Sequence, residues 1–430
     1  MTKLQKKFAT AIATGALLFN TALPVFADYT VVISGNGSDS DNEAEVEVEQ
    51  STTVVQSNNA DIYNEVHADA DTGGNDAEGN TGGDVKIDTG DAETTVDVKN
   101  EANSNVASVD CCQAGDVDVL IEGNGEGSDN EVEVEVNDSW KKDTGISVFQ
   151  SNVAEIDNKV YADADTGDNE AEDNTGGDVE IKTGSATVGV TLSTSANANS
   201  ARVGGGSDGE STLSARIIGN GSDSDNEIEI ELEKELAVVQ SNFADIYNKV
   251  SADADTGDND AEDNTGGSVL IDTGDAEATV DIDNMVNFNW ADVDCGCLFD
   301  VLAKIAGNGE DSDNEIELEL EDELAVFQGN CDDLGLDAQT NHGREECEVD
   351  NKVWADADTG DNEAEDNTGD PGDDPTVETG DATVDVDLEN TGNANVYGET
   401  PEWELPEWLG GFSINITLDL SDLLDLLGLA

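Results

Sequence analysis

The stretch Ala252-Asp-Ala-Asp-Thr-Gly-Asp-Asn-Asp-Ala-Glu-Asp-Asn-Thr-Gly-Gly267 occurs four times in the chain with small changes. The other copies cover residues 68–83, 162–177 and 355–370. Each copy combines carboxylates with Thr-Gly pairs and Asn residues, which favour turns. We therefore predict that each copy forms the end of a strand, an acidic loop and the start of the next strand, and that the chain is a repeat protein.

Period-two alternation precedes every copy. Ala, Val, Ile or Leu alternates with Glu in residues 43–49, 131–136, 227–232 and 315–320. This spacing places apolar side chains on one face and carboxylates on the other, which is typical of a half-buried strand. The alternation continues through residues 60–70, and only the last ten residues have a helical period.

The copies are evenly spaced apart from two insertions. From Gly-Asn-Gly to Ala-Asp-Ala-Asp the distance is 33 positions in the first and third repeats, 39 in the second and 48 in the fourth. The extra residues lie around Trp140 and between Gln328 and Asn351. Insertions confined to such points mark loops between fixed strands.

These patterns predict an all-β fold, a β-solenoid similar to a β-helix, made of four repeats of about 90 residues and a short C-terminal cap. Tandem small β domains are the alternative. Inward Asn64, Asn158, Asn248 and Asn351 fit stacked amide ladders, although Asn is also common in turns. The expected division is a signal peptide at 1–27, repeats at 28–115, 116–214, 215–302 and 303–398, and a cap or docking segment at 399–430.

The N-terminus and the charge indicate the compartment. Lys3, Lys6 and Lys7 precede an apolar run and a small-residue cleavage site ending at Ala27, which is the layout of a secretory signal peptide. We expect an extracellular or cell-surface protein with no transmembrane segment in the mature chain. The chain has 101 acidic and 16 basic residues, a net charge of −85, and this sign excludes nucleic acid as a partner.

So many carboxylates within a Debye length of one another repel, so cations must neutralise them. Calcium prefers hard oxygen ligands, and each acidic loop offers several. The candidate calcium ligands are Asp69, Asp71, Asp163, Asp165, Asp168, Asp253, Asp255, Asp258, Asp356, Asp358 and Asp361. The match to an EF-hand is partial, and the alternative is a solvated acidic surface adapted to high salt.

The run that begins at Gln56 and recurs at Gln150, Gln240 and Gln328 resembles the Gln- and Asn-spaced strands of curlin-type repeats. The Asn- and Gly-rich repeats are similar to secreted bacterial surface proteins of β-solenoid type. This resemblance implies a structural or adhesive role at the cell surface. The expected partners are divalent cations, with self-association or other surface components as further candidates.

Cysteine usage agrees with secretion. Cys331 and Cys347 bracket the insertion of the fourth repeat, and we predict a disulfide between them. Closing a loop of this size stabilises a protein by about 3 kcal/mol. Cys111, Cys112, Cys295 and Cys297 have matching places in two repeats and are expected to form disulfides within or between chains, with a metal site as the weaker alternative.

The remaining features argue against an enzyme. His67 and His342 are the two histidines, and neither has a recurrent partner in sequence. Paired carboxylates can serve a glycosidase, but four repeated copies suit binding better than one active site, so a carbohydrate-active enzyme is the less favoured reading. The C-terminal segment, with Trp403, Trp408 and an alternating run at 412–420, is expected to cap the stack or dock a partner.

Overall fold

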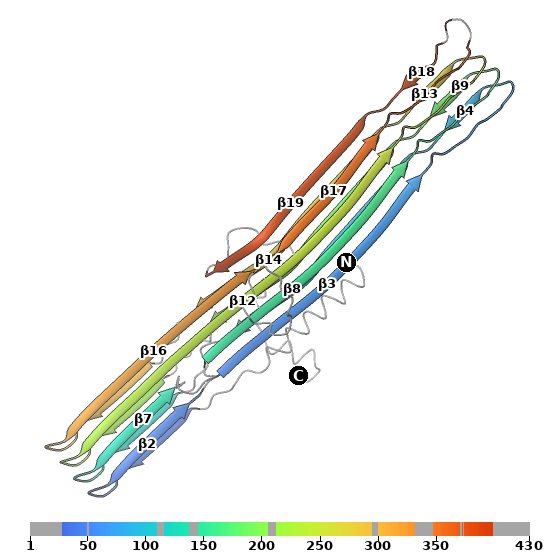
Figure 1. Ribbon diagram of the computed structural model, residues 1–430. Coiled ribbons are helices and arrows are strands. Elements are labelled where there is room, and N and C mark those ends of the chain that lie inside the picture. The colour runs from blue at the N-terminus through green and yellow to red at the C-terminus, as the bar shows by residue number, and fades with distance from the viewer. Residues whose placement is uncertain are drawn as a thin grey trace, which may run out of the picture.

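The computed structural model describes residues 28–49, 51–109, 116–136, 145–204, 212–294, 300–331, 347–369, 372 and 374–398. Within these residues every regular element is a β-strand, and every strand pair is parallel. The chain winds through four coils that stack side by side, which confirms the predicted all-β solenoid (Figure 1). The expected cap at 399–430 and its helical turns lie outside the described residues.

One coil takes the chain from one end of the molecule to the other and back. In the first coil β1 (Tyr29–Ser34) leads to the Gly-Asn-Gly turn. Next, β2 (Asp41–Val48) and β3 (Ser51–Asp71) run to the acidic loop. The chain returns through β4 (Val85–Asp88) and β5 (Ala92–Val109). We call the two ends the turn end and the loop end, after the Gly-Asn-Gly turn and the acidic loop.

The later coils repeat this path. The second coil contains β6 (Val117–Glu122), β7 (Asp129–Val136), β8 (Gly145–Asp165), β9 (Val179–Lys182) and β10 (Ala186–Gly204). The third contains β11 (Thr212–Ile218), β12 (Asp225–Asp255), β13 (Val269–Asp272) and β14 (Ala276–Asp294). The fourth contains β15 (Asp300–Ala306), β16 (Asp313–Asn330), β17 (Glu348–Asp358), β18 (Thr376–Glu378) and β19 (Ala382–Tyr397).

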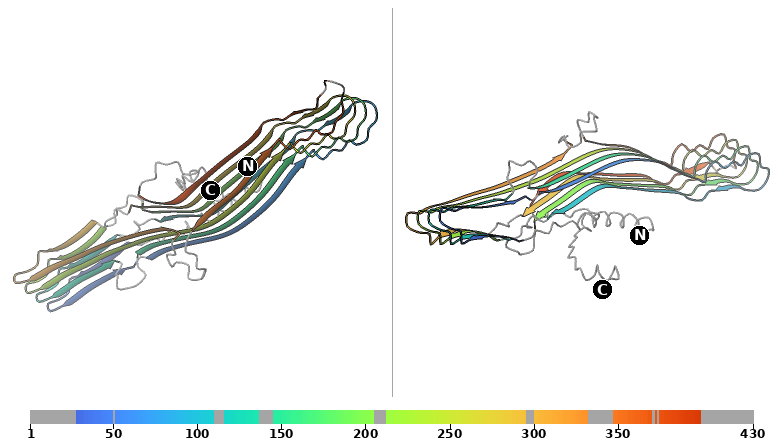
Figure 2. Two further views of the ribbon diagram at one scale, coloured as in Figure 1. Left: turned by 45° about the horizontal axis from the view of Figure 1, so that its top comes forward. Right: turned by 90° about the horizontal axis from the view of Figure 1, so that it is seen from below.

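Equivalent strands form four sheets in two layers. The long sheet contains β2, β3, β7, β8, β12, β16 and β17. The opposite layer is formed by the sheet of β5, β10, β14 and β19 together with the smaller sheets of β1, β6, β11 and β15 and of β4, β9, β13 and β18. Figure 2 shows the elongated, flattened body that results. The coils are in exact sequence register, with Asn64 opposite Asn158, Asn248 and Asn351.

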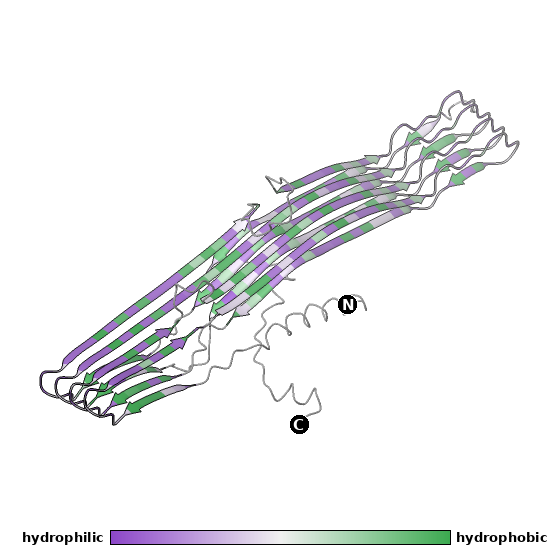
Figure 3. Ribbon diagram, turned by 60° about the horizontal axis from the view of Figure 1, so that its bottom comes forward, coloured by the Kyte–Doolittle hydropathy of each residue, from purple (hydrophilic) through white to green (hydrophobic). Residues whose placement is uncertain are grey.

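The core lies between the two layers and follows the period-two pattern. Val160 and Ala162 of β8 pack with Val188, Val190 and other apolar residues of β10, and the alternation is visible along the strands in Figure 3. The core consists mainly of Ala, Val, Ile and Leu side chains, with Phe288 as a buried aromatic residue.

Amide ladders complete the interior. Asn158 Nδ2 donates to Asn248 Oδ1 at 2.8 Å, and Asn248 Nδ2 donates to Asn351 Oδ1 at 2.7 Å. Gln240 Nε2 donates to Gln150 Oε1 at 2.8 Å in the opposite direction along the stack. The ladder interpretation of the inward Asn residues is therefore confirmed, and each buried amide finds a partner in the next coil.

Candidate functional site

The loop end is shaped by a turn that repeats in each coil. The aspartates that end the long strands, Asp71, Asp165, Asp255 and Asp358, each accept a hydrogen bond from the backbone N–H of the glycine two residues later, at 2.6–2.8 Å. The glycine is needed for close approach, because a Cβ on Gly167 would lie 2.0 Å from the carbonyl oxygen of Gly257 in the next coil. The turns therefore stack as tightly as the strands.

This stacking brings eight of the predicted calcium ligands into two columns on the outer face of the long sheet. One column contains Asp69, Asp163, Asp253 and Asp356, and the other contains Asp71, Asp165, Asp255 and Asp358. Neighbouring parallel strands lie about 4.8 Å apart, so each carboxylate has a like charge on one or both sides. The alanines between them point inward and are buried in the two internal coils.

The other three predicted ligands lie in the adjoining loop. Asp168, Asp258 and Asp361 occupy equivalent positions with φ of 56°, 52° and 49°. Gly74 takes this place in the first coil with φ of 63°. Asp is one of the few non-glycine residues that tolerate this left-handed conformation. Asp168 and Asp258 lie near the column of Asp165 and Asp255, since both raise the pKa of Asp165 and Asp258 also raises that of Asp255. Asp361 raises the pKa of Asp258.

The stacked carboxylates of the two columns repel one another. Burial, followed by neighbouring carboxylates, raises the pKa of Asp163, Asp165, Asp253 and Asp258 above the usual aspartate value. Asp255 lies in the third coil, with a coil on each side, and its pKa is affected most. Burial, together with the charges of Asp165, Asp258 and Asp358, raises this pKa to about 6. The hydrogen bond from the Gly257 N–H acts in the opposite direction. A bound cation would favour the charged form and relieve this repulsion.

Sequence reasoning missed a second group of carboxylates in the same loop. Oxygens of Glu172, Asp260 and Glu262 lie within 4.8 Å of one another, and so do oxygens of Glu262, Glu363 and Glu365. The signal was present in the repeated motif Asp/Glu-Ala-Glu, whose alanines Ala171 and Ala261 are fully buried. Because the alanine points into the core, the carboxylates before and after it both point outward, on the same side of the chain.

Glu172 has the most perturbed pKa of this group. A hydrogen bond with Glu170 and repulsion from it raise the pKa of Glu172 to about 7. The pKa of Glu262 is raised mainly by the charge of Asp260, and that of Glu365 by a hydrogen bond with Glu363. Closely spaced carboxylate oxygens of this kind are the hard ligands that calcium accepts.

Aromatic and basic side chains lie beside the aspartate columns on the outer face. His67 stacks on Tyr161 with ring centroids 4.7 Å apart and contacts Glu65 Oε1 at 3.3 Å. Lys249 lies over the rings of Tyr161 and Trp354 at 5.0 and 5.6 Å. His67 is exposed on the outer face, and Tyr161 and Trp354 occupy the equivalent positions of later coils. His342 lies outside the described residues.

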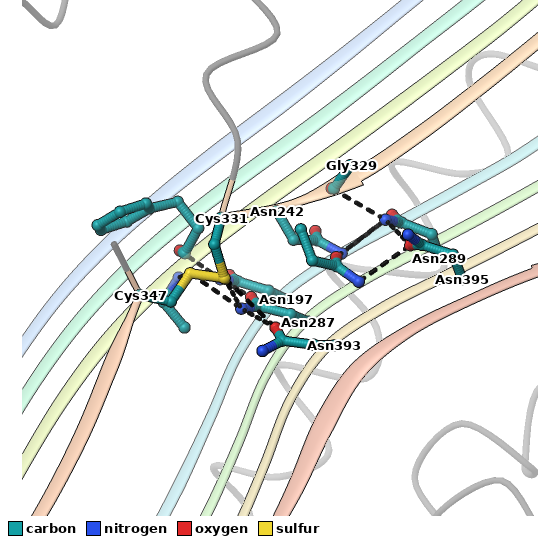
Figure 4. Close-up of a disulfide and its surroundings, with 12 residues drawn as sticks. Asn197, Asn242, Asn287, Asn289, Gly329, Cys331, Cys347, Asn393 and Asn395 are labelled. Carbon is teal, nitrogen blue, oxygen red and sulfur yellow. Dashed lines mark hydrogen bonds between the residues drawn. A yellow bond between two sulfur atoms is a disulfide. The ribbon is translucent and has the colours of Figure 1, made fainter. Parts of the chain in front are cut away.

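The predicted disulfide between Cys331 and Cys347 is confirmed (Figure 4). β16 ends opposite Asn242 and β17 starts opposite Asp245, so the bridge closes the insertion at a point where β12 is continuous. Asn287 Nδ2 contacts Cys347 Sγ at 3.4 Å and donates to Asn393 Oδ1 at 3.0 Å. Cys111, Cys112, Cys295 and Cys297 lie outside the described residues.

Neither a family model, a curated protein nor a solved structure matches this chain. Within the described residues, the structure contains no helix with the length and apolar character needed to cross a membrane.

Proposed function

We propose that this chain is a secreted structural or adhesive protein of the cell surface whose acidic columns bind calcium or other divalent cations. The observation that carries the proposal is the in-register stacking of Asp163, Asp253 and Asp356, and of Asp165, Asp255 and Asp358, with pKa values that are raised in the internal coils. Stacked carboxylates of like charge repel one another, and bound counterions would stabilise the compact form at neutral pH.

The expected ligands are the eleven aspartates predicted from sequence, joined by Glu172, Asp260, Glu262, Glu363 and Glu365. The repetition of these groups along a rigid stack suits a structural role better than catalysis, because a catalytic site needs one differentiated constellation. The signal-peptide pattern at residues 1–27 supports export, where calcium is abundant and disulfides persist.

The test compares calcium with sodium. If the columns are specific sites, millimolar calcium raises the melting temperature far more than sodium chloride of equal ionic strength, because binding to the folded state adds RT ln(1 + [L]/Kd) per site. The triple variant D253N/D255N/D258N should lose much of this effect. Calcium uptake measured by titration calorimetry should saturate in the wild type.

A matched control removes equal charge elsewhere in the same coil. The variant D225N/E227Q/E229Q neutralises three carboxylates near the turn end and should retain the calcium effect. A third variant, E172Q/D260N/E262Q, reports which group of the loop takes the ion. Equal stabilisation by both salts without saturable uptake would contradict the proposal and favour a structural protein adapted to high salt.

A further inference from the structure

The two ends of the stack are open sheet edges. The first coil has no coil before it and the fourth has none after it among the described residues. On the fourth coil the exposed edge includes β16 with 18 residues and β19 with 16. Long unprotected edges present unpaired backbone groups and are templates for pairing with another chain.

The fourth coil also exposes side chains that belong to the core. Ile316 and Leu318 are 47% and 45% exposed, whereas their equivalents in the third coil, Ile228 and Ile230, are fully buried. On the opposite edge, Ala44 and Val46 hold the same columns with smaller side chains. Ala44 and Val46 are 4% and 7% exposed, and the half-exposed apolar side chains of that edge are Val54, Ile62 and Val66 of β3. The two edges therefore carry apolar side chains in the same columns.

The amide ladders make this match directional. Every Asn of the long-sheet ladders donates to the following coil, so Asn314, Asn330 and Asn351 end the stack with Nδ2 groups directed away from the third coil. The residues that a following coil would present are Asn42, Asn58 and Asn64, whose Oδ1 atoms receive no bond from a preceding coil. The Gln ladder runs the other way, so Gln56 offers the donor and Gln328 the acceptor.

Glycines at the first edge supply independent evidence. A Cβ on Gly184 or Gly274 would lie 2.3 or 2.2 Å from the carbonyl oxygen of the equivalent glycine in the preceding coil, so these positions require glycine. Gly90 and Gly37 are the first-coil equivalents at two such positions. A Cβ on either meets nothing within 4 Å, and neither has the left-handed φ that would favour glycine. A coil stacked before the first one at the same spacing would exclude a side chain at both positions.

From these observations we propose that the protein polymerises head to tail, with the first coil of one copy stacked in register on the fourth coil of another. The contact is heterologous and open-ended, so it generates filaments. The alternating segment at residues 412–420 is too short to cover both β16 and β19, whereas a second copy pairs with the whole edge. The proposal deepens the structural role proposed above and specifies the partner as a second copy.

The aspartate columns continue across the junction, with Asp356 and Asp358 meeting Asp69 and Asp71 of the next copy in the pattern seen between β12 and β17. Divalent cations should therefore promote assembly. Four coils at a spacing of about 4.8 Å give an axial repeat of about 19 Å per copy.

The test is sedimentation and electron microscopy of the full chain over a range of concentrations, in sodium chloride with and without calcium. The wild type should form an open-ended series of species and filaments with the axial repeat given above. G37A/G90A should remain monomeric with an unchanged melting temperature. G189A is the matched control, because its Cβ would lie 4.0 Å from Thr95 Oγ1 and faces no edge, and it should assemble like the wild type.

A wild type that stays monomeric at all concentrations would overturn the proposal, as expected if residues 399–430 cap the fourth coil. Assembly of G37A/G90A equal to that of G189A would overturn it as well. This experiment and the calcium experiment can fail independently of each other. Filaments without saturable calcium uptake refute cation binding alone, and a monomer stabilised specifically by calcium refutes stacking alone.

Discussion

The third and fourth coils carry nearly the same sequence in the long sheet but differ in burial. β12 and β16 share the alternation of Glu with Ile or Leu from Asp225 and Asp313 onward. Ile230 is fully buried and Leu318 is 45% exposed. In most folds a core position is covered by elements on several sides, whereas here much of the cover comes from one neighbour along the axis. A residue of this solenoid therefore owes its environment to the coil that follows it as much as to its own sequence.

The core side chains should show the largest difference between the two coils. Ile230→Ala creates a cavity and is expected to destabilise the protein by about 2–5 kcal/mol, whereas Leu318→Ala should have an effect below about 1 kcal/mol, because its side chain is half in water already. Denaturant unfolding of both variants, below the concentration at which chains associate, measures the gap. Equal losses would mean that something else covers the fourth coil.

Assembly should reduce the difference in destabilisation between Ile230→Ala and Leu318→Ala. Above the concentration for stacking, Leu318 would be buried against Val46 of another copy, so Leu318→Ala should become more damaging while Ile230→Ala is unchanged. If the difference between the two variants does not change with concentration, head-to-tail stacking is contradicted. The difference measured for isolated chains would still hold.

The amide ladders should give the next largest effect. Asn248→Ala removes the partner of Asn158 Nδ2 and of Asn351 Oδ1, and leaving buried polar groups unpaired costs about 1–3 kcal/mol. Asn351→Ala should cost less, because Asn248 Nδ2 keeps its bond to Asn284 Oδ1 and Asn390, to which Asn351 donates, is exposed to water. The shift of the urea midpoint for each variant checks the order. A larger loss at Asn351 would show that terminal ladders are not solvated.

The sequence was sufficient to predict the repeat, the strand faces and the disulfide, because each depends on local spacing. Period-two alternation fixes which side chains point inward, and identical spacing between copies fixes the register, so Asn64 and Asn158 had to meet once the coils stacked. The two aspartate columns follow from the same rule. These features recur in every coil, and stacking the coils in register brings equivalent residues together.

Other features depend on where the chain turns in space. The approach of Glu172 to Asp260 and Glu262 arises from the path of the acidic loop, which spacing alone does not define. Nothing in the sequence distinguishes Ile228 from Ile316, because their exposure is set by position in the stack. The left-handed φ of four residues inside strands also lacked a signal beyond a recurrent Asn. These residues are Asn103, Asn197, Asn287 and Asn393.

The smallest expected effect is on the pH dependence of stability, and it distinguishes two aspartates in neighbouring coils. Asp255 has a pKa raised to about 6, chiefly by burial, and Asp178 has a pKa lowered by hydrogen bonds from Ser268 N–H and Oγ–H. A carboxyl with a raised pKa binds a proton more readily in the folded state than in the unfolded one. It therefore favours folding as the pH falls from about 6 toward 4.

A carboxyl with a lowered pKa has the opposite influence, and its stabilisation is lost as the pH falls through the acid range. In the absence of calcium, D255N should therefore reduce the gain in melting temperature between pH 7 and pH 5. D178N should preserve this gain and reduce the loss of stability below pH 4. Asn keeps the oxygen that accepts the Gly257 N–H, so the turn itself is retained. If the column binds the ion, saturating calcium should remove the wild-type gain between pH 7 and pH 5, because the bound cation replaces the proton as the neutralising charge. The pH dependence of the wild type should then no longer differ from that of D255N. A difference that persists in calcium would place the ion elsewhere in the loop, and the carboxylates of Glu172, Asp260 and Glu262 would be the next to substitute.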